Sequence, residues 1–127
     1  MRKGHNTTGT FGEVLRPIAS LISKSEKAQQ KLTAGTWQHK MLQDNIKALY
    51  IASALINKDA DNSDPFIRND LQDALQALTS MLDKVEKTAG KFSLGTAQHT
   101  LQRNRLNALR IAESVIKVEL NNLYPNC

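Results

Sequence analysis

Four stretches of the chain place apolar residues three or four positions apart, which is the spacing of one face of an α-helix. They cover residues 11–32, Thr36 to about Asn57, about Pro65 to about Ala89, and Thr96 to about Leu123. The alternation of apolar and polar residues that is typical of a half-buried strand is absent. The pattern therefore predicts an all-α protein with four helices.

The apolar residues of each stretch fall on one stripe and are expected to form a shared core. These residues are Phe11, Val14, Leu15, Ile18, Leu21, Ile22, Ala28 and Leu32, then Met41, Leu42, Ala48, Leu49, Ala52, Leu55 and Ile56, then Ile67, Leu71, Leu75, Leu78, Met81, Leu82 and Val85, then Leu101, Ala108, Leu109, Ala112, Ile116 and Leu120. A chain of 127 residues can bury such a core without disulfides or metals. We therefore expect one domain that spans residues 1–127.

Local signals set the expected starts of the first and third helices. Residues 10–13 have the T-x-x-E form of a capping box, so the first helix is predicted to begin near Phe11 and to continue, with a kink, through Pro17. Residues 1–10 are rich in glycine, threonine and asparagine and are expected to be disordered. The third helix is predicted to begin at Asp64-Pro65, an N-cap followed by a proline in the first turn.

A pentapeptide occurs twice, as Gly35–His39 and as Gly95–His99, with Trp37 replaced by alanine in the second copy. The offset of 60 positions continues without a gap from residues 15–56 to residues 75–116, where 15 of 42 aligned pairs are identical. Glycine favours the end of one helix and threonine caps the start of the next, so each copy predicts a helical hairpin. The sequence thus predicts an antiparallel up-down four-helix bundle built from two duplicated hairpins, with both pentapeptides at the same end.

Composition limits the setting in which the protein works. The only cysteine, Cys127, is the last residue, so no disulfide forms within the chain and a reducing compartment is favoured. No apolar run approaches the ~20 residues that span a bilayer, and the first ten residues lack the apolar core of a signal peptide. We therefore expect a cytoplasmic protein without a membrane-spanning segment. The net charge of +5 is compatible with a polyanionic partner.

Four polar residues are predicted to share one layer of the bundle. Arg105 and its counterpart Asn45 lie on the inward stripes, ten residues after their glycines, and Glu26 and Glu86 precede theirs by nine. At ~1.5 Å per residue, all four lie at similar heights. A buried guanidinium needs a carboxylate, so we expect Arg105 to pair with Glu86 or Glu26. A small polar ligand pocket between the helices is the functional alternative.

Basic residues suggest two further contacts. If the pentapeptides share one end of the bundle, Lys31, Lys91, His39 and His99 gather there, and they either complement the helix ends or bind an anion. A metal on the two histidines is disfavoured, because the lysines repel it and no H-x-x-H or E-x-x-H spacing occurs.

On the fourth helix, Arg103 and Arg110 face away from the stripe and could contact a polyanion. The second hairpin has this basic face and the first does not.

The second helix carries a residue that only one copy of the repeat contains. Trp37, with Met41 one turn later, marks a possible interface with a protein partner or a second copy of the chain. Catalytic triads, phosphate loops and dinucleotide fingerprints are absent from the sequence, so no catalytic residue, cofactor or metal is assigned. We expect a non-enzymatic interaction or regulatory protein. The alternatives are a nucleic-acid-binding module that uses the fourth helix and a helical-bundle binder of a small anion.

Overall fold

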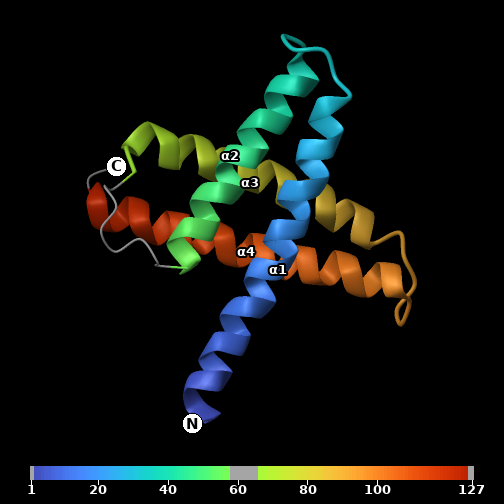
Figure 1. Cartoon of the computed structure of the whole chain (residues 1–127), viewed down its shortest axis with the longest axis vertical. Helices are drawn as coiled ribbons and strands as arrows, with labels where there is room; N and C mark the ends of the chain where they lie inside the picture. The colour runs from blue at the N-terminus through green and yellow to red at the C-terminus, as the bar shows by residue number, and fades with distance from the viewer. Residues whose placement is uncertain (1, 58–65, 126–127) are drawn as a thin grey trace.

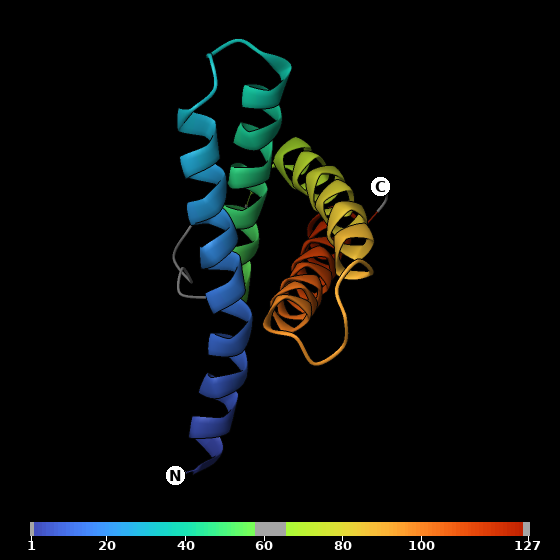
Figure 2. The same ribbon diagram turned by 90° about the vertical axis from the view of Figure 1, so that its right-hand side faces the viewer.

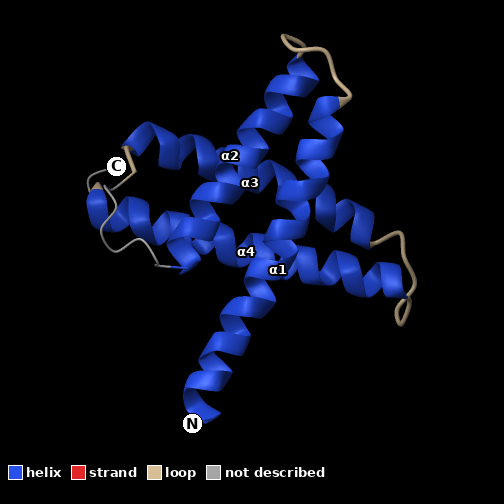
Figure 3. Ribbon diagram, in the orientation of Figure 1, coloured by secondary structure: helices blue, strands red, loops and turns tan. Residues whose placement is uncertain are grey.

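The computed structural model describes residues 2–57 and 66–125, with side chains described from Val14 onward. Its four helices are α1 (Arg2–Gln30), α2 (Trp37–Asn57), α3 (Arg68–Ala89) and α4 (Ala97–Leu123). The described residues contain no strand (Figures 1 and 3). The predicted all-α class with four helices is therefore confirmed.

The helices form two layers, and each layer is a pair. α1 and α2 lie side by side, as do α3 and α4, and the two pairs cross steeply in Figure 1. Figure 2 shows the same layers from the side. Among the described residues, α1 contacts α2 and α4 but not α3, whereas α2 contacts both helices of the other layer.

The two pentapeptide turns therefore lie at the ends of different pairs, and Figures 1 and 2 place them far apart. The common end that the sequence predicted does not form. A shared end requires four nearly parallel helix axes, and the steep crossing of the two layers removes that geometry.

The two turns nevertheless have the same internal structure. Gly35 and Gly95 adopt φ values of 96° and 85°, in the left-handed region that glycine enters without steric cost. The Thr36 hydroxyl accepts from the backbone N–H of His39 at 3.3 Å, and the Thr96 hydroxyl accepts from that of His99 at 3.1 Å. Each threonine hydroxyl also donates to the carbonyl three residues earlier, at 2.8 Å in both turns. The threonines therefore cap the next helices, as predicted, but α1 ends at Gln30 and α3 at Ala89 with Gly90 as its C-cap, so Gly35 and Gly95 bend the turns and do not end the helices before them.

The core lies between the two layers and consists of apolar side chains from all four helices. Its fully buried large residues are Ile18, Leu49, Leu71, Leu78, Leu109 and Ile116. Alanines occupy equivalent buried positions on the two helices that meet across the layers, Ala48 and Ala52 on α2 and Ala108 and Ala112 on α4. Small side chains allow two helix axes to approach closely, which suits the contact between α2 and α4.

Two helix starts differ from the sequence prediction. α1 begins at Arg2, so residues 2–10 are helical where disorder was expected. Glycine costs ~1 kcal/mol in a helix interior, but a helix that is already nucleated is extended without a second nucleation cost. The helix also continues through Pro17, as predicted. α3 begins at Arg68 after Ile67, which caps it without a side-chain hydrogen bond, whereas the expected start at residues 64–65 lies outside the described residues.

Three residues of the predicted stripes face solvent instead. Ala28 is exposed, Ile67 is 59% exposed and Leu101 is 39% exposed. Ile67 precedes the first residue of α3, and Leu101 lies in the first turns of α4, where the crossing of the layers leaves the helix end uncovered. In the described part of the chain, no helix combines the length and the apolarity that crossing a bilayer requires.

Candidate functional site

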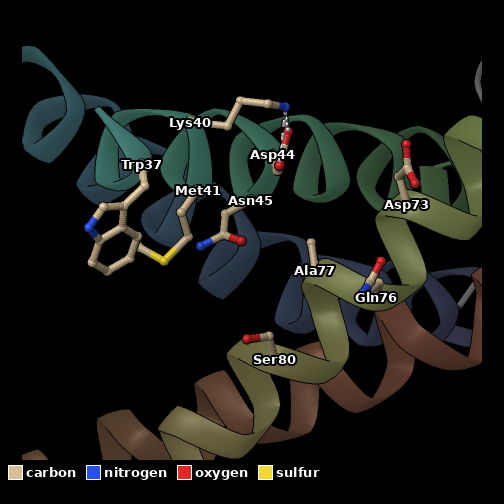
Figure 4. Close-up of a pocket in the computed structure, with 9 residues that line it drawn as sticks. All are labelled: Trp37, Lys40, Met41, Asp44, Asn45, Asp73, Gln76, Ala77 and Ser80. Atoms are coloured by element: carbon tan, nitrogen blue, oxygen red, sulfur yellow. Dashed lines mark hydrogen bonds and ion pairs between the residues drawn. The ribbon is translucent and has the colours of Figure 1, made fainter. Parts of the chain in front are cut away.

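A cleft of about 490 Å³ lies between α2 and α3 (Figure 4). Its wall on α2 consists of Trp37, Lys40, Met41, Asp44 and Asn45, and its wall on α3 consists of Asp73, Gln76, Ala77 and Ser80. The two walls belong to different layers. The cleft thus lies where the crossing pairs diverge, and one wall begins at a pentapeptide turn.

Trp37 stands at the end of this cleft with most of its indole in water. It is the first residue of α2, so the Gly35-Thr36 turn fixes its position, and its side chain is 71% exposed. Figure 4 shows the thioether of Met41 beside the indole ring, where a polarizable sulfur packs favourably. Nζ of Lys84 donates to Sδ of Met41 at 3.4 Å, which ties this apolar end to α3. The structure therefore brings together Trp37 and Met41, which the sequence proposed as an interface.

The rest of the cleft is mostly polar and includes two carboxylates and one lysine. Nζ of Lys40 lies 3.1 Å from Oδ1 of Asp44, in an exposed pair worth less than ~1 kcal/mol. Asp73, on the opposite wall, is exposed and has no hydrogen-bond or ion-pair partner among the described side chains. Two carboxylates and one lysine suit a cationic group better than an anion. Asn45 and Gln76 supply amides that can both donate and accept.

The predicted polar layer does not form around Arg105. Oε2 of Glu86 lies 3.0 Å from Nη2 of Arg110, and Oε2 of Glu26 accepts from the Tyr50 hydroxyl at 3.2 Å. Arg105 is half-buried, and its Nε is buried without a hydrogen-bond partner. The expected Arg105–Glu86 or Arg105–Glu26 pair is therefore wrong. Equal height along the bundle did not place these groups on facing sides, because both glutamates are exposed at the helix flank.

The two glutamates instead make equivalent contacts within their own pairs. Glu26 and Glu86 are 60 positions apart, and so are their partners Tyr50 and Arg110. The carboxylate of Glu26 raises the pKa of Tyr50 above its ordinary value of 10.0, chiefly through its charge and also through the hydrogen bond, since both disfavour a phenolate. The fourth predicted member, Asn45, lines the cleft.

The basic groups proposed as anion contacts are dispersed. The separated turns divide Lys31 and His39 from Lys91 and His99. On α4, Arg103 is exposed, whereas Arg110 is engaged by Glu86. Within the described residues, no group of three histidine, cysteine, aspartate or glutamate side chains is arranged to hold a metal ion.

The sequence did not reveal the α3 wall of the cleft. In the sequence, Asp73, Gln76 and Ser80 have the spacing of solvent-facing positions on an amphipathic helix. They lie opposite α2 only because the two layers cross. Comparisons of the chain with protein-family models, curated proteins and solved structures found no match.

Proposed function

We propose that this is a non-enzymatic interaction protein that docks a segment of a partner protein in the α2–α3 cleft, with Trp37 as the anchor. The exposure of Trp37 beside the cleft is the observation on which the proposal rests. A tryptophan side chain buries about 200 Å², so covering the 71% that is exposed removes about 140 Å² from water. At ~25 cal/mol per Å², that burial corresponds to at most ~3.5 kcal/mol, from which the ordering costs of association are subtracted.

The walls of the cleft define the chemistry of the partner segment. Trp37 and Met41 offer an apolar and polarizable surface at one end, and the carboxylate of Asp73, which has no partner among the described side chains, lies on the opposite wall. We propose a segment with an aromatic or aliphatic side chain for the first surface and a lysine or arginine for the second. The amides of Asn45 and Gln76 can bond to its backbone.

We also propose that the fold arose by duplication of an antiparallel helical hairpin and retains an up-down chain order within each pair. The matched hydrogen bonds of the two turns and the matched contacts of Glu26 and Glu86 support this proposal. In an experimental structure, residues 15–56 should superpose on residues 75–116. Different turn conformations or opposite packing of the two pairs would contradict it.

The test of the docking proposal is a selection of random peptides on the folded protein, followed by calorimetry of the selected sequences. We expect peptides that combine an aromatic or aliphatic residue with a lysine or arginine. Trp37→Ala should weaken their binding by ~2 kcal/mol or more, about 30-fold. Asp73→Asn should weaken it less and reduce its sensitivity to salt.

Leu94→Ala is the matched control for Trp37→Ala. Leu94 is 82% exposed, lies in the turn between α3 and α4 and does not line the cleft, so it is as accessible as Trp37 but outside the proposed docking site. Equal losses in the two variants would contradict docking at the cleft. Light scattering of the free protein tests whether a second copy of the chain occupies the cleft. If the protein is a dimer and Trp37→Ala makes it a monomer, the cleft binds a second copy and not a partner segment.

A further inference from the structure

The solvent face of α1 carries a row of cations, Arg16, Lys24, Lys27 and Lys31, here called the α1 basic stripe. All four side chains are exposed, and Lys31 directly follows the helix end. At 100° per residue they fall within about 80° of one another around the helix axis. The stripe runs 15 residues, which is ~22 Å at 1.5 Å per residue.

None of these cations has an ion-pair partner among the described side chains. The described ion pairs join residues of α2, α3 and α4, and none involves α1. Glu26, which precedes Lys27 in the sequence, accepts from the Tyr50 hydroxyl. Among the side chains described from Val14 onward, the stripe is therefore positive charge without an ion-pair partner, on a protein whose net charge is +5.

The helix dipole accounts for only part of this arrangement. Lys27 lies in the last turn of α1, where a cation stabilises the helix end. That effect is confined to the last turn, so it does not explain Lys24 or Arg16.

The equivalent face of α3 shows what distinguishes α1. Lys84, Lys87 and Lys91 lie 60 positions after Lys24, Lys27 and Lys31. On α3, however, Oδ2 of Asp83 lies 3.2 Å from Nζ of Lys87, and Nζ of Lys84 donates to Met41. The α1 counterpart of Asp83 is Ser23, which leaves the charge of the stripe intact.

We propose that the α1 basic stripe binds the phosphate backbone of duplex nucleic acid without reading its sequence. Four cations spread over ~22 Å cannot converge on one small anion, but they can follow a row of phosphates. Ser20 and Ser23 lie exposed among them and add hydroxyl donors, which also bind phosphates. From Val14 onward, the exposed α1 residues include no aromatic side chain for stacking on bases, so a duplex is favoured over a single strand.

A membrane surface fits this face less well. An interfacial helix inserts an apolar face beside its cations. In α1 the apolar residues Ile18 and Ile22 are buried in the core, and the described exposed residues are polar, charged or alanine. This surface is also distinct from the α4 face that the sequence suggested, Arg103 and Arg110, of which Arg110 is paired with Glu86.

The test measures binding of the whole protein to a fluorescently labelled 20-base-pair duplex by anisotropy at several salt concentrations. Four phosphate contacts predict a slope of about −3.6 for log K against log salt, from ~0.9 per contact. The triple variant Lys24→Gln, Lys27→Gln, Lys31→Gln should bind at least ~10-fold more weakly at low salt, with a slope near −0.9.

The matched control is the triple variant Lys84→Gln, Lys87→Gln, Lys91→Gln, which removes the same charge from the equivalent face of α3. It should keep a slope near −3.6 and bind within ~2-fold of the unaltered protein. Circular dichroism checks that both triple variants remain folded. Equal weakening by the two variants, or no duplex binding by the unaltered protein, would overturn the proposal.

Two competitors distinguish other polyanions. Polyglutamate and unlabelled duplex are compared as competitors at equal concentrations of negative charge. If polyglutamate displaces the labelled duplex equally well, the stripe attracts any polyanion and the phosphate assignment is overturned. Vesicles that contain phosphatidylserine should not bind. Binding to vesicles in the absence of duplex binding would reassign the stripe to a membrane surface.

Discussion

Replacing Arg105 with methionine is predicted to stabilise the protein. Arg105 is half-buried, and its Nε is buried without a hydrogen-bond partner. A buried donor left unpaired costs ~1–3 kcal/mol. Methionine removes that donor while its unbranched side chain keeps much of the apolar volume of the arginine stem. Because part of the Arg105 side chain remains in water, we take the lower end of this range and expect Arg105→Met to raise the free energy of unfolding by about 1 kcal/mol.

The comparison variants remove Glu86 or its partner. Glu86→Gln and Arg110→Met each break the ion pair between these residues, whose side chains are 51% and 55% exposed. An exposed pair contributes only ~0.2–1 kcal/mol, so each variant should lose less than ~1 kcal/mol. The order of stability should therefore be Arg105→Met first, then the unaltered protein, then the Glu86 and Arg110 variants.

Urea denaturation followed by circular dichroism measures these differences, because a shift of midpoint at constant m-value reports stability directly. A gain of 1 kcal/mol corresponds to about 4 °C in Tm for a domain of this size. A loss of more than ~1 kcal/mol in Arg105→Met would refute the reasoning, since it would show that the guanidinium makes a stabilising contact. A loss of ~3 kcal/mol in Glu86→Gln would show that this glutamate neutralises a buried charge.

Three further predictions test the turns, the core and a titrating pair. Thr36→Ala and Thr96→Ala should each cost ~1 kcal/mol in denaturant melts, because both hydroxyls accept the same capping bond; a difference above ~1 kcal/mol would show that the turns are not equivalent. Leu109→Ala should cost ~2–5 kcal/mol because Leu109 is fully buried, whereas Leu94→Ala should stay within ~0.5 kcal/mol; similar costs would contradict the assigned core. Glu26→Gln should lower the pKa of Tyr50 in ultraviolet titrations, because the charge of Glu26 raises it. Because the pKa of Tyr50 is raised above 10.0 in the folded state, the stability that comes from its hydrogen bond to Glu26 is present below pH 10 and is lost as the pH rises through the folded-state pKa. An unchanged Tyr50 titration in Glu26→Gln would show that Glu26 does not raise this pKa.

The elements that the sequence predicted well are those fixed by local chemistry. Thr36 and Thr96 cap the following helices as expected, and Gly35 and Gly95 adopt left-handed conformations, because both preferences act within a few residues; the preceding helices, however, end before the glycines. α2 and α4 begin one residue after Thr36 and Thr96, where their starts were predicted, and they end at the predicted residues, Asn57 and Leu123. Apolar spacing similarly identified most of the core.

The relative placement of the helices could not be read in the same way. A stripe of apolar residues shows which face is buried, but the crossing angle depends on how side-chain ridges from two helices interlock. The predicted pairing of Arg105 with Glu86 or Glu26 was wrong for this reason. The sequence indicates the height of each side chain along its helix axis, but the direction in which the side chain faces depends on how the helices cross. The cleft itself depends on the crossing, so Asp73 could not be connected with Trp37 from the sequence.

The most direct test of docking at the α2–α3 cleft is the fluorescence of Trp37, which is the only tryptophan in the chain. In the free protein the indole should emit at the long wavelength of a solvated tryptophan and be quenched readily by acrylamide, because it is 71% exposed. Addition of a peptide selected on the protein should shift the emission to shorter wavelength and protect it from acrylamide. A saturating peptide that leaves both the emission and the quenching unchanged would contradict docking against Trp37.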